Sequence, residues 1–133
     1  MWVIDTSAWI EWLAATPAGE ILAQRFPDPK QWIVPSLVQL ELTKWITREL
    51  GEAKAKDVLA FTTECRVVDL DTPTAVLAAE LCVQHRLATA DAVIYATAKR
   101  FGVELVTCDA HFRNLPGVIF LAKPSTNALQ DGD

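Results

Sequence analysis

Four acidic side chains occupy positions at which a parallel α/β fold places its ligands. Asp5 follows the apolar run Trp2–Ile4, and Asp109 follows a second apolar run late in the chain. Glu41 lies on the helix predicted after the second strand, and Asp91 lies in the first turn of a later predicted helix. Strand ends and helix starts converge on one edge of the sheet in such folds, so these carboxylates are expected to meet there.

Each of these acids, taken alone, also has an ordinary structural explanation. Asp5 could cap the following helix, Asp109 could close a turn, and Glu41 could point into solvent. Asp91 falls in the first turn of its helix, where an acid is worth about 0.3–1 kcal/mol through the helix dipole. The four positions together favour a common site, because each one returns to the same sheet edge.

Carboxylates gathered at one place need a counter-charge. Two of them about 4 Å apart repel each other by about 4 kcal/mol at an effective dielectric of about 20. Oxygen ligands of this kind suit hard cations such as Mg²⁺ or Mn²⁺. Such ions lower the pKa of a bound water, orient it on a phosphorus and stabilise the leaving oxygen. The residues therefore predict metal-assisted hydrolysis of a phosphodiester bond.

The elements that must position these acids alternate between strands and helices. Apolar runs predict strands over 2–4, 32–34, 67–70, 103–107 and 118–121. Helical patterns between them are typical of a parallel sheet with helices on both faces, with the first run as a central strand. The runs lack strict alternation, as expected for strands that are covered on both sides. Ser36 and Gln39 predict a capping box at the start of the helix that carries Glu41.

Length, composition and charge bound the class of protein. The 133 residues suit one domain with a real core, and 51% hydrophobic against 22% charged residues indicates a globular chain. The three cysteines lack a C-x-x-C spacing, which argues against a disulfide scaffold or a zinc site. The net charge of −5 argues against broad attraction to nucleic acid. A nucleic-acid substrate would need metal ions or a local basic surface.

The sequence carries no pattern that predicts export or membrane insertion. The N-terminus lacks a basic region, and Asp5 and Glu11 interrupt any signal-peptide core. No apolar run approaches the length of a membrane span. We therefore expect a cytoplasmic protein that makes no membrane contact. The domain is expected over residues 1–124, followed by a polar, frayed tail over 125–133.

Four segments that contain the acids carry a recognisable family pattern. They are Val3–Ser7, Pro35–Glu41, Leu87–Ala98 and Leu105–Phe112. In this order and spacing they resemble PIN-domain ribonucleases, and most closely the VapC-type toxins of bacterial type II toxin–antitoxin systems. The resemblance extends from the first residue to about Leu121, which is nearly the whole chain.

This resemblance implies a three-layer α/β/α PIN-like domain with a mainly parallel five-stranded sheet. The metal-binding and catalytic set that it implies is Asp5, Glu41, Asp91 and Asp109, accompanied by the hydroxyls of Ser7 and Thr107. The implied cofactor is Mg²⁺, with Mn²⁺ as the alternative, and the implied substrate is single-stranded or looped RNA. Homodimerisation and inhibition by a cognate VapB-like antitoxin are implied as well.

Further residues near the acids have chemical potential together with simpler explanations. His111 could act as an acid or a base, yet a surface turn explains it. Lys44 and Arg48 could contact RNA phosphates, yet a solvated helix face explains them. Trp9 and Trp12 lie three residues apart on the first helix and are not both expected to pack inward. One of this pair is therefore expected at an interface with a partner.

Two other classes of function are open at this point. A receiver-type phosphoacceptor domain also has a parallel five-stranded sheet with an acid after its first strand. Its phosphorylated aspartate would have to be Asp69 or Asp71, and Glu41 and Asp91 would then have no role. A catalytically silent PIN-like module would only bind a partner. The presence of all four acids favours the active nuclease over that module.

Overall fold

A computed structural model describes residues 1–123 of the chain, and the tail expected over 125–133 lies outside them. Within these residues the strands are β1 (Trp2–Ile4), β2 (Trp32–Pro35), β3 (Arg66–Val68), β4 (Glu104–Thr107) and β5 (Val118–Phe120). The α-helices are α1 (Thr6–Leu13), α2 (Pro17–Arg25), α3 (Ser36–Leu50), α4 (Glu52–Thr62), α5 (Thr72–His85) and α6 (Thr89–Arg100). Two short 3₁₀ turns are η1 (Pro29–Gln31) and η2 (Ala110–Phe112).

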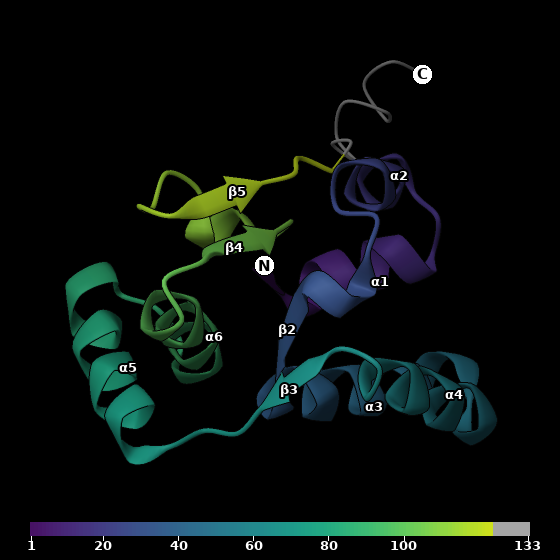
Figure 1. The fold of residues 1–133 in the computed structure, drawn as a ribbon, viewed down its shortest axis with the longest axis horizontal. Coiled ribbons are helices and arrows are strands. Elements are labelled where there is room, and N and C mark those ends of the chain that lie inside the picture. The colour runs from purple at the N-terminus through teal and green to yellow at the C-terminus, as the bar shows by residue number, and fades with distance from the viewer. Residues whose placement is uncertain (124–133) are drawn as a thin grey trace.

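The strands form one all-parallel sheet in the order β3-β2-β1-β4-β5. β1 is central, as predicted, with Val3 paired to Ile33 on β2 and to Leu105 on β4. Helices α5 and α6 lie on one side of the strands, α1 and α2 lie on the other, and the α3–α4 pair lies towards β3 (Figure 1). The predicted α/β/α architecture is confirmed. No helix within residues 1–123 has the length and apolar character needed to cross a membrane.

The expectation that every strand is covered on both faces is wrong for β3. Arg66 and Val67 are exposed, whereas all four residues of β2 are buried. β3 lies at the edge of the sheet, and short edge strands with charged residues are a common protection against pairing with other chains. The three middle strands are β2, β1 and β4, and each of them leads into a segment that carries one of the acids.

Helix α3 begins without the capping box predicted from its sequence. Pro35 is the N-cap residue, so Ser36 is already the first helical residue. Gln39 instead donates from Nε2 to the hydroxyl oxygen of Thr62 on α4, at 3.1 Å. Gln39 therefore connects α3 to α4 and does not take part in a capping box.

Both tryptophans of α1 pack inward, which corrects the prediction that only one would fit. Trp9 is 0% exposed and Trp12 is half-buried. Their rings meet Trp32 of β2 edge-on, with centroid distances of 5.1 and 5.4 Å, and Trp12 also lies 5.3 Å from Phe61 of α4. Aromatic pairs of this kind contribute about 0.5–1.5 kcal/mol each beyond their buried area. The cluster fixes α1 against β2 and α4.

Gly19 allows α2 to approach α1 closely. A Cβ atom at this position would overlap the carbonyl oxygen of Glu11 and lie 2.8 Å from the Cα of Trp12. Backbone atoms cannot move aside as the end of a flexible side chain can. We expect Gly19→Ala to lower the free energy of unfolding by about 1–3 kcal/mol. Urea unfolding followed by tryptophan fluorescence measures this, and an unchanged midpoint would show that the two helices are not in close contact.

Candidate metal centre

Asp5 occupies the junction between β1 and α1. Its backbone N–H donates to the carbonyl oxygen of Val106 on β4 at 2.9 Å, which continues the sheet by one residue. Its own carbonyl oxygen accepts from the N–H groups of Ala8 and Trp9 at 3.0 and 3.1 Å, which starts α1. Asp5 is the N-cap residue through its backbone, and within the described chain its side chain makes no capping bond. The carboxylate is therefore available to the site.

Two hydroxyl groups orient the Asp5 carboxylate. Ser7 Oγ and Thr107 Oγ1 both donate to its Oδ2 atom, at 2.8 and 2.7 Å. Ser7 Oγ accepts from the backbone N–H of Cys108 at 3.0 Å, and Thr107 Oγ1 accepts from that of Asp109 at 2.9 Å. Because each hydroxyl oxygen accepts a bond from a backbone N–H group, its own proton points towards the carboxylate of Asp5. The same network connects α1 to the turn after β4.

Glu41 reaches the cluster from α3, where Thr6 holds it. The Thr6 hydroxyl donates to Glu41 Oε1 at 2.7 Å, across 35 positions of the sequence. Because Thr6 directly follows Asp5, this bond connects α3 to the first residue of α1. No role at the site was predicted for Thr6. Its position between Asp5 and Ser7 is the one feature of the sequence that places it near the acids.

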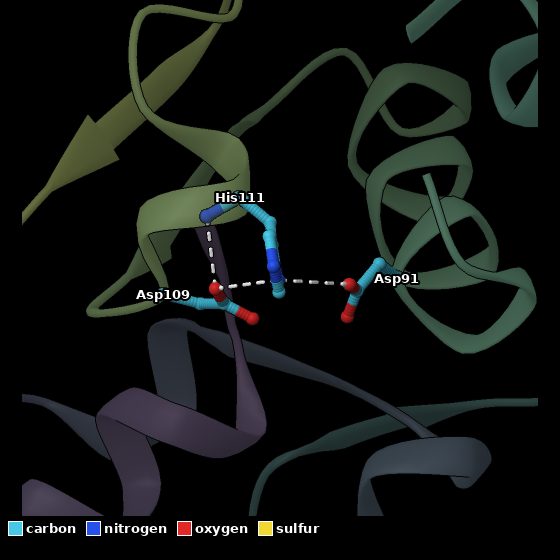
Figure 2. A group of neighbouring side chains, drawn as sticks. All are labelled: Asp91, Asp109 and His111. Atoms are coloured by element: carbon cyan, nitrogen blue, oxygen red, sulfur yellow. Dashed lines mark hydrogen bonds and ion pairs between the residues drawn. The ribbon is translucent and has the colours of Figure 1, made fainter. Parts of the chain in front are cut away.

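Asp91, Asp109 and His111 lie beside one another, with the ring of His111 between the two carboxylates (Figure 2). The two acids are partly exposed and His111 is exposed, whereas Asp5 is buried. Asp109 Oδ1 accepts from the backbone N–H of His111 at 2.9 Å. The ring Nδ1 of His111 lies 3.1 Å from the same oxygen and 3.9 Å from Asp91 Oδ2. One ligand atom from each of these three residues lies within 4.8 Å of the others. Asp91 comes from the first turn of α6, as predicted, and Asp109 also caps η2.

Burial raises the pKa of the Asp5 carboxyl, which is 3% exposed. The negative charge on Asp109 raises it further, while the hydrogen bonds from Thr107 and Ser7 act in the opposite direction. The charged form of Asp5 is therefore costly in the metal-free fold, despite its two donors.

Loss of hydration also raises the pKa of Asp91, to about 6. The charges on Asp109, Asp5 and Glu41 raise it as well, in that order, whereas His111 lowers it. The other three acids are therefore close enough to act on the charge of Asp91, although the ligand atoms that lie within 4.8 Å of one another belong to Asp91, Asp109 and His111, and not to Asp5 or Glu41. The fold thus brings Asp91 and Asp109 together, and Asp5 is connected to Asp109 through the hydroxyl of Thr107.

Asp69 and Asp71 are the two aspartates that a receiver domain could phosphorylate here, and neither belongs to the group that could hold a metal ion. Asp71 caps α5 by accepting from the N–H of Thr74 at 2.9 Å, and its other oxygen lies 3.9 Å from Arg100. Asp69 is exposed. The strand order also differs from the 2-1-3-4-5 order of flavodoxin-like receivers, because β3 here lies beside β2 at the sheet edge. The receiver interpretation is therefore wrong.

The three cysteines are free thiols, as expected, and none of them belongs to the group of side chains that could hold a metal ion. Cys65 and Cys108 are buried, and Cys82 is partly exposed. Burial raises the pKa of Cys108 to about 11, with a further contribution from the charge of Glu11. Although Cys108 stands between two residues of the site, its thiol is protonated at neutral pH and binds metals poorly.

The sequence model of the PIN-domain family matches residues 2–118. The chain belongs to the PIN-domain family. No curated protein matches the sequence. The match covers all four acids and both hydroxyls that orient Asp5, so the acid cluster lies inside the region that defines this PIN domain.

Solved structures share the fold of this PIN domain. A toxin–antitoxin complex from Klebsiella pneumoniae superposes with a TM-score of 0.79 at 18% identity, covering 93% of this chain and 100% of that one. VapC20 from Mycobacterium tuberculosis, a toxin that cleaves the sarcin–ricin loop, gives 0.70 at 22% identity, covering 93% and 100%. VapBC2 from Rickettsia felis, bound to DNA from its promoter, gives 0.70 at 14% identity, covering 92% and 98%.

The residues present at this site fit a divalent cation. Within residues 1–123, no lysine or arginine pairs with any of the four acids, and neutral hydroxyls provide the bonds that orient Asp5 and Glu41. In that part of the chain, His111 is the one basic side chain within 4.0 Å of a carboxylate oxygen of the four acids. Clustered oxygen donors whose charge is not otherwise neutralised are the arrangement that hard cations require.

Proposed function

We propose that this PIN domain is a divalent-metal-dependent endoribonuclease that acts as the toxin of a toxin–antitoxin pair. The observation that carries this proposal is the group formed by Asp91, Asp109 and His111, whose ligand atoms lie within 4.8 Å of one another, with no lysine or arginine paired to either acid in residues 1–123. We propose that Asp5 and Glu41 complete the site, since their charges also raise the pKa of Asp91. The fold neighbours support the role, since they include toxin–antitoxin complexes and a toxin that cleaves the sarcin–ricin loop. We propose RNA as the substrate and the cytoplasm as the place of action.

Each residue of the site has a proposed role in hydrolysis. Asp5, Asp91 and Asp109 would hold Mg²⁺ or Mn²⁺, and Glu41 would complete the set or accept the proton of the attacking water. The bound cation would neutralise the acids, polarise the phosphodiester and stabilise the leaving oxygen. The hydroxyls of the site keep the carboxylates of Asp5 and Glu41 in fixed orientations, which is the preorganisation that such chemistry requires.

A pocket beside Glu41 offers a path for the RNA strand. It has a volume of about 380 Å³, and its lining includes Thr6, Glu41, Lys44, Trp45 and Arg48. Both cations are exposed on α3, and Arg48 also pairs with its neighbour in the sequence. On a chain with a net charge of −5, we propose that these two cations supply the local contacts to the phosphates of the RNA. The half-buried Trp45 adds a surface on which a base can stack.

The double variant Lys44→Ala/Arg48→Ala should therefore bind RNA more weakly. We expect KM to rise about tenfold, with a shallower dependence on salt concentration and an unchanged affinity for the cation. The double variant Lys54→Ala/Lys56→Ala removes two exposed cations of α4 that do not line the pocket, and it serves as the control. Equal effects of the two double variants would show that general charge, and not this pocket, attracts the RNA.

We also expect a homodimer and a cognate VapB-like antitoxin that blocks the site. The fold neighbours crystallised as toxin–antitoxin complexes support the second expectation. Co-expression with an antitoxin encoded beside the gene should relieve growth inhibition by the toxin.

Mapping of RNA ends in cells tests the proposed function. Brief expression of the wild type should create new RNA ends at a limited set of positions, and Asp5→Asn should create none, since it removes a ligand charge while leaving the fold intact. Identical end profiles for the two proteins would contradict ribonuclease activity at this site. If neither protein cleaves RNA but the antitoxin still binds, the silent PIN-like module is the better account.

A further inference from the structure

We propose that His111 is a metal ligand together with Asp91 and Asp109, and that its nitrogen makes the site prefer a first-row transition cation such as Mn²⁺ over Mg²⁺. This inference rests on the metal-dependent function proposed above. It revises the sequence interpretation, in which His111 is a surface turn residue and Mg²⁺ is the first choice of cofactor.

The turn after β4 holds His111 beside the carboxylates. The backbone N–H of His111 donates to Asp109 Oδ1 at 2.9 Å, and this bond begins η2. The same turn brings the ring back over that carboxylate, with Nδ1 at 3.1 Å from Asp109 Oδ1. The side chain is 78% exposed, yet its ring lies between Asp109 and Asp91 (Figure 2). A nitrogen that can bind a cation therefore faces the cluster.

The spacing of the three ligand atoms suits a single ion. Two ligand atoms on one octahedral ion, each at about 2.1 Å, are about 3.0 Å apart when adjacent and about 4.2 Å apart when opposite. Nδ1 of His111 lies 3.1 Å from Asp109 Oδ1, close to the adjacent distance, and 3.9 Å from Asp91 Oδ2, close to the opposite distance, and all three ligand atoms lie within 4.8 Å of one another. Small side-chain movements are thus sufficient to bring all three onto one cation.

The donor set indicates which cation is preferred. Mg²⁺ is bound almost entirely through oxygen and keeps much of its water, whereas imidazole nitrogen suits the divalent ions of the first transition row. Carboxylate oxygens with one imidazole therefore favour Mn²⁺ over Mg²⁺.

Electron spin-echo envelope modulation of the Mn²⁺-loaded protein detects a bound nitrogen directly. The chain contains two histidines, so His85 on α5 supplies a matched control. We expect nitrogen modulation in the wild type and in His85→Ala, and none in His111→Ala. Calorimetry should show that His111→Ala weakens Mn²⁺ binding by at least about tenfold, while Mg²⁺ binding changes by less than about twofold.

The outcomes separate this inference from the function on which it rests. Mn²⁺ bound to the wild type without nitrogen modulation would overturn the role of His111 and leave the ribonuclease proposal standing. Equal losses of Mn²⁺ and Mg²⁺ affinity in His111→Ala would overturn the proposed selectivity. Failure of the wild type to bind either cation, with the circular dichroism of a folded protein, would overturn the metal site itself.

Discussion

Replacing Asp91 with asparagine will abolish RNA cleavage and, in the same protein, stabilise the metal-free fold. Cleavage should fall by at least about a thousandfold, because a neutral amide is a poor ligand for a hard cation. Stability should rise because desolvation and the charges on Asp109 and Asp5 raise the pKa of Asp91 to about 6. With a discount for solvent screening, the gain is about 1–2 kcal/mol at neutral pH. Single-turnover cleavage and urea unfolding in EDTA measure the two effects.

A matched control distinguishes this result from a general effect of losing a carboxylate. The hydrogen bonds from Thr74 at the start of α5 lower the pKa of Asp71, so the charged form is favoured there. Asp71→Asn should leave cleavage unchanged and should not raise stability. Wild-type cleavage by Asp91→Asn, or destabilisation of its metal-free form, would contradict the assignment of Asp91 to a repulsive metal site.

The metal-free wild type will lose stability from this site as the pH rises, and a divalent cation will restore it. The pKa values of Asp5 and Asp91 are raised above the ordinary value of 3.8 in the folded protein, to about 6 for Asp91. At pH values between 3.8 and about 6, the folded state therefore binds more protons than the unfolded state does. The stabilisation is therefore fully present below about pH 4 and is lost as the pH rises through about 6.

Cation binding should show the reverse dependence on pH. Since the ion displaces protons from Asp5 and Asp91, its affinity should fall as the pH drops below about 6. Near neutral pH, a cation at about 100 times its Kd should stabilise the fold by about 2.7 kcal/mol. Urea unfolding across a pH series, in EDTA and with Mn²⁺, measures both effects. Parallel pH profiles for the metal-free wild type and Asp91→Asn would contradict this coupling.

The gathering of the acids could be predicted because it follows from strand ends. Apolar runs define β1 and β4, and parallel strands bring their carboxyl ends to the same edge whatever the details of packing. Asp5 and Asp109 follow directly from that rule. Asp91 follows from its place in the first turn of α6. The sequence pattern was sufficient here because the backbone alone sets these positions.

The side-chain partners could not be predicted, because tertiary packing decides them. The bond from Thr6 to Glu41 depends on the rotation of α3 about its axis, and α3 packs against α1, α4, α6 and β2. The direction of the His111 ring depends on the turn geometry of η2, which the spacing to Asp109 does not fix. The two tryptophans of α1 fit inward because β2 and α4 supply aromatic surfaces for both.

We propose that the four acids form one cation site that cleaves RNA. The most direct measurement is the cleavage rate of a single-stranded RNA by the purified protein as Mn²⁺ is added to the metal-free form. We predict no cleavage in EDTA, a rate that saturates together with cation binding, and no cleavage by Asp5→Asn at any concentration. Equal cleavage by the wild type and Asp5→Asn, or cleavage by the wild type that persists in EDTA, would contradict it.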